Sequence, residues 1–163
     1  MRKLLIGSFL LVLAAVGWLY WSPGHAADQI QAAAAAEDTT ALAELVDYPM
    51  LRTTLKDQFD RVLLSRMPNG PGEIGRALIS AVTEPLAERL GSPQGVVFMV
   101  RNASPFIPLG DATITTRVQR EDHTRAMLIL IRSDSPRDST MFALERDGWQ
   151  WRMTGAFITE VIR

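Results

Sequence analysis

The chain has 163 residues, of which 17 are basic and 18 acidic, so its formal net charge is -1, and it contains no cysteine. Without cysteine it has no disulfides, iron-sulfur ligation or thiol chemistry, so an exported domain must be held by its apolar core. Because the charges balance without runs of one sign, a nucleic-acid partner has no electrostatic support, and no metal cluster, nucleophile motif or phosphate loop indicates a cofactor.

The N-terminus carries the strongest signal. Arg2 and Lys3 precede an uncharged run from Leu4 to Trp21, which as a helix spans about 27 Å, close to the roughly 30 Å hydrocarbon core of a bilayer. No lysine or arginine follows before Arg52, so the positive-inside rule places the N-terminus in the cytoplasm. We predict a signal-anchor helix over residues 1–27, a single pass through the inner (cytoplasmic) membrane, and a periplasmic or extracytoplasmic remainder.

The same segment has a second interpretation, a cleaved secretory signal peptide. Such peptides have shorter apolar cores, and Gly24-His25-Ala26 supplies the small residues of a cleavage site. Against cleavage, Trp18, Tyr20 and Trp21 cluster at the outer end of the run, where aromatic rings favour the headgroup level of a membrane that the helix keeps occupying. We therefore prefer a retained anchor, with a soluble periplasmic protein as the alternative.

Helical signals dominate residues 28–103. The alanine-rich stretch 28–37 has high helix propensity and is predicted to continue from the anchor or to begin just beyond it. Asp38 and Asp47 each stand where an N-cap carboxylate accepts the free amides of a first helical turn, which predicts a short helix after Asp38 and a longer one after Asp47. The longer helix should end near Arg66, before Pro68-Asn69-Gly70-Pro71-Gly72. Its apolar residues share one face: Leu51, Leu55, Phe59, Val62 and Leu63.

A family resemblance is carried by the stretch from Ala32 to Gln58. It joins an alanine-rich helix to Glu37-Asp38 and then to the sequence Leu45-Val46-Asp47-Tyr48-Pro49-Met50-Leu51-Arg52-Thr53-Thr54-Leu55-Lys56. This pattern resembles an uncharacterised bacterial membrane-anchored family known as domain of unknown function 2939. The resemblance is best over residues 1–58 and looser over the C-terminal half. It implies a bacterial envelope protein and no activity.

Among the charged residues of the helical part, Asp47 and Arg52 form the pair that most suggests a functional site. In a functional interpretation, the guanidinium orients the carboxylate in a pocket. In the interpretation that we prefer, Asp47 is a helix cap whose charge is also paired with Arg52, because N-caps are common and need no substrate.

Two further helices are predicted before the strands. Residues spaced by four indicate a helix from Gly72 or Glu73 to about Leu90, which Pro85 should kink or divide. Ser92-Pro93 offers an N-cap and a first-turn proline for residues 93–102, although the apolar run 96–100 is equally consistent with a buried strand. We prefer a helix and expect both segments to cover a sheet. The alternative is a lipid-facing or partner-binding surface.

Four strands are predicted after the loop at residues 104–110. Residues 111–120 are rich in Thr, Ile and Val, and residues 125–132 are apolar on both faces, which indicates a central strand covered on both sides. Asp147-Gly148, a dipeptide favoured in two-residue hairpin turns, joins the last pair at 140–146 and 149–158.

These elements predict an α+β protein. Its N-terminal transmembrane helix is followed by a single extracytoplasmic domain, residues 28–163. In that domain, several helices (28–103) pack on one face of a four-stranded antiparallel meander (110–160). The layout has a looser likeness to the cystatin-like and nuclear-transport-factor-like cone folds, an analogy that implies no function.

The last strand offers the best candidate pocket. Trp149, Trp151 and Met153 alternate with polar residues and would form one aromatic face, which is either the wall of an apolar ligand cavity or ordinary core packing. We prefer core packing, with each indole nitrogen finding a nearby partner.

Enzymatic interpretations find little support in the residue inventory. His25 and His123 are the only histidines, so a histidine metal cluster or a Ser-His-Asp relay is hard to assemble. Asp47, Asp111 and Asp122 remain available as acids or bases. We expect no enzyme, but a non-catalytic, membrane-tethered domain that contacts an envelope protein or a lipid. The alternative is a cone-type domain that binds or processes a small apolar ligand.

Overall fold

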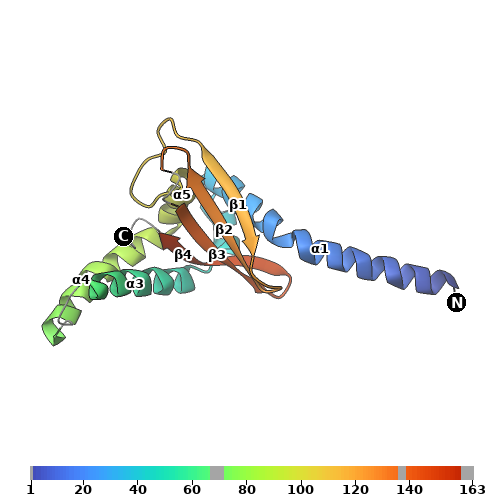
Figure 1. The fold of residues 1–163 in the computed structure, drawn as a ribbon, viewed down its shortest axis with the longest axis horizontal. Coiled ribbons are helices and arrows are strands. Elements are labelled where there is room, and N and C mark those ends of the chain that lie inside the picture. The colour runs from blue at the N-terminus through green and yellow to red at the C-terminus, as the bar shows by residue number, and fades with distance from the viewer. Residues whose placement is uncertain (1, 67–71, 136–138, 159–163) are drawn as a thin grey trace.

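The computed structural model describes residues 2–66, 72–135 and 139–158; the side chains of residues 2–16, 19 and 20 also lie outside the description. The predicted loop at Pro68 to Pro71 and the side chains of Arg2, Lys3 and Tyr20 are therefore outside the described part. Five helices pack against a four-stranded antiparallel sheet, so the fold is α+β (Figure 1).

The first helix, α1, runs without a break from Arg2 to Ala35 and includes Pro23. Its 34 residues correspond to a length of about 51 Å. The second half of α1 packs into the domain through residues at helical spacing. All but one of them are alanines, which let the helix lie close to its neighbours. The buried residues are Ala26, Ala27, Ile30, Ala33 and Ala34. Among the residues described in full, no helix is both long enough and apolar enough to cross a membrane.

Two aspartates cap the next helices. Asp38 Oδ1 accepts hydrogen bonds from Thr40 N and Ala41 N at the start of α2, Thr39–Leu45. Asp47 Oδ1 accepts one from Met50 N at 3.0 Å at the start of α3, Tyr48–Ser65. Each carboxylate satisfies amides that have no partner within the helix.

The expected ion pair between Asp47 and Arg52 is not formed. Arg52 Nε instead donates to Gly91 O at 3.1 Å, at the C-terminal end of the next helix. Residues five apart on a helix point about 140° away from each other, so a cap carboxylate and Arg52 cannot meet on one face. Arg52 therefore joins two helices.

The helices α4, Glu73–Leu90, and α5, Pro93–Asn102, follow. Pro85 lies inside α4 without dividing it. Ser92 Oγ accepts from Gly95 N at 3.1 Å and caps α5, so the segment 93–102 is a helix, as its start signals indicated. The turn between these helices is tight: a Cβ on Gly95 would lie 2.3 Å from Arg89 O, which leaves room only for glycine.

The sheet is a meander in the order β1-β2-β3-β4, as predicted. Its strands are Ile114–Arg120, Arg125–Arg132, Ser139–Asp147 and Gln150–Ile158. The first strand begins at Ile114 instead of residue 111. In the last hairpin Asp147 pairs with Gln150, so the turn consists of Gly148 and Trp149, one residue later than predicted. Gly148 has a φ of 61°, which glycine adopts at little cost.

A β-bulge divides the last strand. Ala143 pairs with Gly155 but Leu144 pairs with Met153, which leaves Thr154 as the extra residue. The bulge reverses the alternation, so that Trp151 and Met153 before it and Ala156 and Ile158 after it are all buried. Thr154 O accepts a hydrogen bond from Thr54 Oγ1 of α3 at 3.2 Å, so the bulge is held by the helical layer.

The helices lie on one side of the sheet (Figure 1), where they bury alternate residues of the strands, such as Leu128, Leu130 and Phe142. On the other side, Met127, Ile129 and Ile131 are half-buried. Within the described ranges no helix covers them, so helices cover β2 on one side, as expected, and the cover expected on its other side stays a prediction.

Candidate functional site

The terminal hairpin does not present the three predicted pocket residues on one face. Trp151 and Met153 point into the core and are buried, whereas Trp149 lies in the turn and is 75% exposed. The difference follows from the turn, because a strand that begins at Gln150 leaves Trp149 projecting beyond the end of the sheet. The exposed ring of Trp149 is in a cation-π contact with Arg146, whose Cζ lies 5.7 Å from the ring centroid.

Trp151 links α1 to the sheet through a hydrogen bond. Its Nε1 donates a 2.7 Å hydrogen bond to Ser22 Oγ, and both residues are buried. The Arg120 Cζ of β1 lies 5.9 Å from the Trp151 ring centroid. The indole is therefore a core residue with a partner for its nitrogen, as expected for Trp151. The same expectation is wrong for Trp149, which is exposed.

Met153 connects the sheet to the start of α3. Its side chain is fully buried, and its carbonyl oxygen accepts a 2.9 Å hydrogen bond from Asp47 N. Val46 and Met153 also form a parallel bridge. Met153 therefore has a structural role in the core, and it lines neither of the hollows next to this strand.

Two hollows flank α1 where it meets the sheet. One, of about 330 Å³, is lined by Trp18 of α1 and by Trp149 and Trp151 of the hairpin, among others. The second, of about 660 Å³, lies between α1 and β1 and is lined by residues that include Trp18, Trp21 and Arg120. Three exposed tryptophans lie at this end of the molecule: Trp18, Trp21 and Trp149. They come from α1 and from the hairpin turn, and not from the last strand alone.

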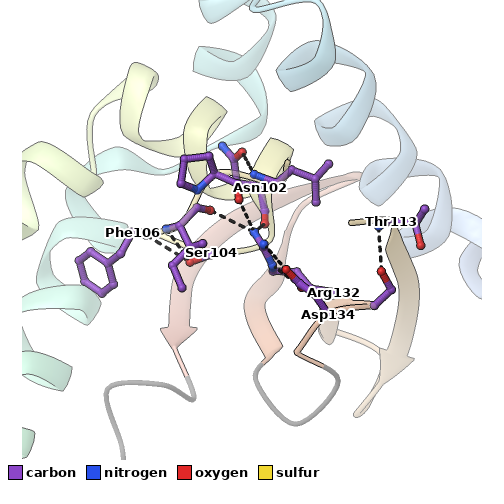
Figure 2. A network of polar contacts seen from close by, with 10 residues as sticks. Asn102, Ser104, Phe106, Thr113, Arg132 and Asp134 are labelled. Carbon is purple, nitrogen blue, oxygen red and sulfur yellow. Dashed lines mark hydrogen bonds and ion pairs between the residues drawn. The ribbon is translucent and has the colours of Figure 1, made fainter. Parts of the chain in front are cut away.

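A buried arginine organises the opposite end of the sheet (Figure 2). Arg132 makes a bidentate ion pair with Asp134, with its Nε 2.9 Å from Oδ1 and its Nη2 2.6 Å from Oδ2. Its Nη1 also donates to three backbone carbonyls, those of Asn102, Ile107 and Pro108, at 3.0 to 3.1 Å. The hydrogen bonds from Arg132 lower the pKa of Asp134 below its usual value, so the carboxylate stays ionised.

These contacts hold the segment from Ala103 to Gly110, here named the braced loop. Ser104 Oγ accepts from Phe106 N and Ile107 N, and Asn102 Oδ1 accepts from Leu109 N at 2.7 Å (Figure 2). Thr140 Oγ1 donates to Ala103 O at 2.8 Å. The loop nevertheless leaves the side chains of Phe106 and Ile107 about half exposed. An internal framework therefore fixes two apolar side chains at the surface.

The helix α4 carries an apolar face that nothing in the described structure covers. Ile74, Leu78 and Val82 are 80%, 65% and 62% exposed, and the smaller residues of the same face, Ala77, Ala81 and Pro85, are exposed as well. These six residues are here named the α4 stripe. The opposite face of α4 is buried through Ile79, Thr83, Ala87 and Leu90. Since the exposed apolar positions recur at helical spacing on a helix that already has a packed face, they form a second amphipathic face.

The braced loop and the C-terminal part of α4 border a groove. A hollow of about 500 Å³ is lined by Leu86 of α4, Phe98 of α5, and Pro105 and Phe106 of the loop, among others. None of the six stripe residues lines this hollow. The spacing of the apolar residues in α4 led us to expect that this face covers the sheet, with a lipid-facing or partner-binding surface as the alternative; the expected cover is wrong for the stripe, whose residues are exposed. The Arg132 framework was missed because its partners are distant in sequence.

Several carboxylates of the domain have structural partners. Asp60 accepts from Lys56 Nζ at 2.7 Å and Thr83 Oγ1 at 2.6 Å; burial alone would raise its pKa, but these two hydrogen bonds outweigh burial and lower it. Asp122 accepts from Thr124 and Arg125 within the β1-β2 turn. Asp47 caps α3, and Asp111 is exposed in a loop. Among the described residues, no three or more His, Asp or Glu side chains are grouped to hold a metal ion.

The fold and these surfaces define a class of protein: an α+β domain with its helices on one side of a meander sheet and apolar residues exposed at both ends. A family model described as "Protein of unknown function (DUF2939)" matches residues 12–99, more than half of the chain, and the chain belongs to this family. The match runs from α1 into α5 and confirms the resemblance predicted from the sequence. No curated protein and no solved structure matches the chain, and the likeness to cone folds stays a prediction.

Proposed function

We propose that the chain is a membrane-tethered, non-catalytic interaction domain of the bacterial envelope. The first part of α1 occupies the inner membrane with its N-terminus in the cytoplasm, and the rest of the chain lies on the outer side. There the α4 stripe and the braced loop bind an apolar segment of another protein. The observation that carries this proposal is the α4 stripe, because Ile74, Leu78 and Val82 are more than 60% exposed on a helix that is already packed.

Burial around residue 22 supports a retained anchor over a cleaved signal peptide. Cleavage after Ala26 would remove Ser22, Pro23 and Ala26, all of which are buried in the folded domain. It would also remove the hydrogen-bond acceptor of the Trp151 indole. A leader that is discarded has no need to supply core contacts, whereas an anchor that remains can do so.

The geometry favours a protein over the bilayer as the occupant of the α4 stripe. The helices α1 and α4 project from opposite ends of the molecule (Figure 1). When the N-terminal part of α1 is in a membrane, the stripe lies on the side away from that membrane. The three carbonyl contacts and the ion pair of Arg132 fix Phe106 before any partner arrives, which lowers the entropic cost of binding.

The test is site-specific photocrosslinking from Val82 in the bacterium of origin, using the full-length chain. The expected result is an adduct with one protein, identified by mass spectrometry, that is reduced at least about tenfold by Leu78→Glu because a charge must be buried. Arg76→Glu, which changes an exposed position outside the stripe, is the matched control and should leave the adduct intact.

Three outcomes would overturn the protein partner: an adduct with a second copy of the chain, an adduct with lipid alone, or equal loss of the adduct in both variants. Thermal unfolding of each variant shows whether the fold survives the substitution, and the exposure of both positions gives no reason for it to fail.

A second candidate function is the binding of a small apolar ligand. The hollow of about 660 Å³ beside Trp18 and Trp21 favours it, since ligand pockets typically enclose roughly 300 to 1,000 Å³. Native mass spectrometry of the chain extracted gently from membranes would show a discrete small adduct that Val118→Trp, which fills this hollow, displaces. An intact N-terminus in the same spectrum would support the anchor, whereas a mass beginning near Ala27 would refute it.

A further inference from the structure

We infer that the turn between β3 and β4 inserts Trp149 into the headgroup region of the same bilayer that α1 enters, so that the domain rests on the membrane at two points. This inference rests on the proposed anchor and adds a second membrane contact. The new contact lies in the hairpin whose Trp151 is hydrogen-bonded to Ser22 of α1, 129 positions away in the sequence.

The first step is that no linker separates the anchor from the folded domain. Trp21 is the last residue of the segment that we predict to span the bilayer, and Ser22, the next residue, is already buried and hydrogen-bonded to Trp151. One residue of helix advances only about 1.5 Å along the axis. The end of the sheet that carries Trp151 therefore lies at the level at which α1 leaves the bilayer.

This end of the sheet exposes tryptophan side chains. Trp149 and Trp21 are 75% and 80% exposed, and Trp18 is more than half exposed. Trp18 and Trp149 line the same hollow, so the indoles from α1 and from the hairpin lie near each other in space. A single exposed tryptophan needs no explanation, but three at one end of a domain form an apolar patch.

The β3-β4 turn places an arginine beside Trp149. Arg146 Nε donates to Gly148 O at 2.9 Å, and its guanidinium stands over the Trp149 ring. This holds a cation and an indole side by side at the tip of the hairpin. The indole ring prefers the boundary between headgroups and acyl chains, and the guanidinium can reach lipid phosphate. Both groups fit a bilayer surface better than an aqueous one.

The experiment uses the absence of cysteine from the chain. Single-cysteine variants Trp149→Cys, Trp21→Cys and Thr113→Cys of the full-length protein are labelled with an environment-sensitive fluorophore and reconstituted in vesicles of phosphatidylcholine and phosphatidylglycerol. Some vesicles contain phosphatidylcholine brominated near the glycerol end of its chains. Thr113 is exposed and lies just before β1, beside Ser133 at the end of the sheet opposite to the β3-β4 turn, so it is the control for a position in water.

The expected result is that bromolipid quenches the probe at position 149 at least about twofold more than the probe at position 113, as for a side chain at the interface. Quenching at 21 but not at 149 would overturn this inference and leave the anchor standing. Absence of quenching at 21 would refute the anchor and the inference together.

Discussion

The indole nitrogen of Trp151 lies 2.7 Å from the hydroxyl oxygen of Ser22 and donates a hydrogen bond to it, across 129 positions of the chain. This bond joins the last strand to the helix that carries the predicted anchor. It makes the position of the domain relative to α1 a property of the folded core, because both residues are buried.

Replacing Ser22 with alanine tests this link. The substitution leaves the buried indole N-H without an acceptor, which should lower the free energy of unfolding by about 1–3 kcal/mol. Urea titration of the full-length chain in detergent, followed by tryptophan fluorescence, measures the change. Ser65→Ala is the control, since its hydroxyl bonds to Val62 O on an exposed helix end. An equal effect of the two substitutions would show that the Ser22 bond adds no stability.

Removing the side chain of Arg132 should loosen the braced loop. Arg132→Ala leaves three carbonyls without their donor, and we expect a loss of about 2–4 kcal/mol in unfolding free energy. Amide hydrogen exchange in residues 103–110 should also rise. Asp134→Asn should cost much less, because that carboxylate is half exposed. Unchanged exchange in Arg132→Ala would contradict the role assigned to this arginine.

The pKa of Asp60 predicts a dependence of stability on pH. Its hydrogen bonds to Lys56 and Thr83 lower the pKa in the folded state below the ordinary value of 3.8. The stabilisation by this group is then fully present above pH 3.8 and is lost as the pH falls through the lower, folded-state pKa. Urea titrations between neutral and acidic pH should show a smaller acid-induced loss for Asp60→Asn than for the wild type. Parallel curves for the two proteins would refute the assignment.

Gly95 should not tolerate a side chain. A Cβ at this position would lie 2.3 Å from Arg89 O and 2.4 Å from Leu90 O, so Gly95→Ala should force α4 and α5 apart and cost about 1–3 kcal/mol. Gly24→Ala is the matched control, because nothing lies within 4 Å of its Cβ position and alanine favours a helix by about 0.5–1 kcal/mol over glycine. Melting temperatures should move in opposite directions in the two variants.

Local signals predicted much of the fold. The carboxylates of Asp38 and Asp47, the first-turn prolines and the apolar periodicity define the helices α2 to α5, because each signal acts between residues within about one turn of one another. The meander order followed from strands joined by short turns. The hairpin turn was misplaced by one residue, since the dipeptide marks a turn region without fixing which pair of residues closes the strands.

Tertiary structure alone decided which side chains meet. The sequence by itself established the charge balance, the uncharged N-terminal run, the α+β layout and the family resemblance. It did not reveal that Trp149 would leave the core while Trp151 entered it, that Thr154 would form a bulge, or that the α4 stripe would stay exposed. These features depend on contacts between distant segments, such as Arg132 with the carbonyl of Asn102 and Trp151 with Ser22. The periodicity of one segment reports that it has an apolar face, but only the packing of all the segments determines whether another part of the chain covers it.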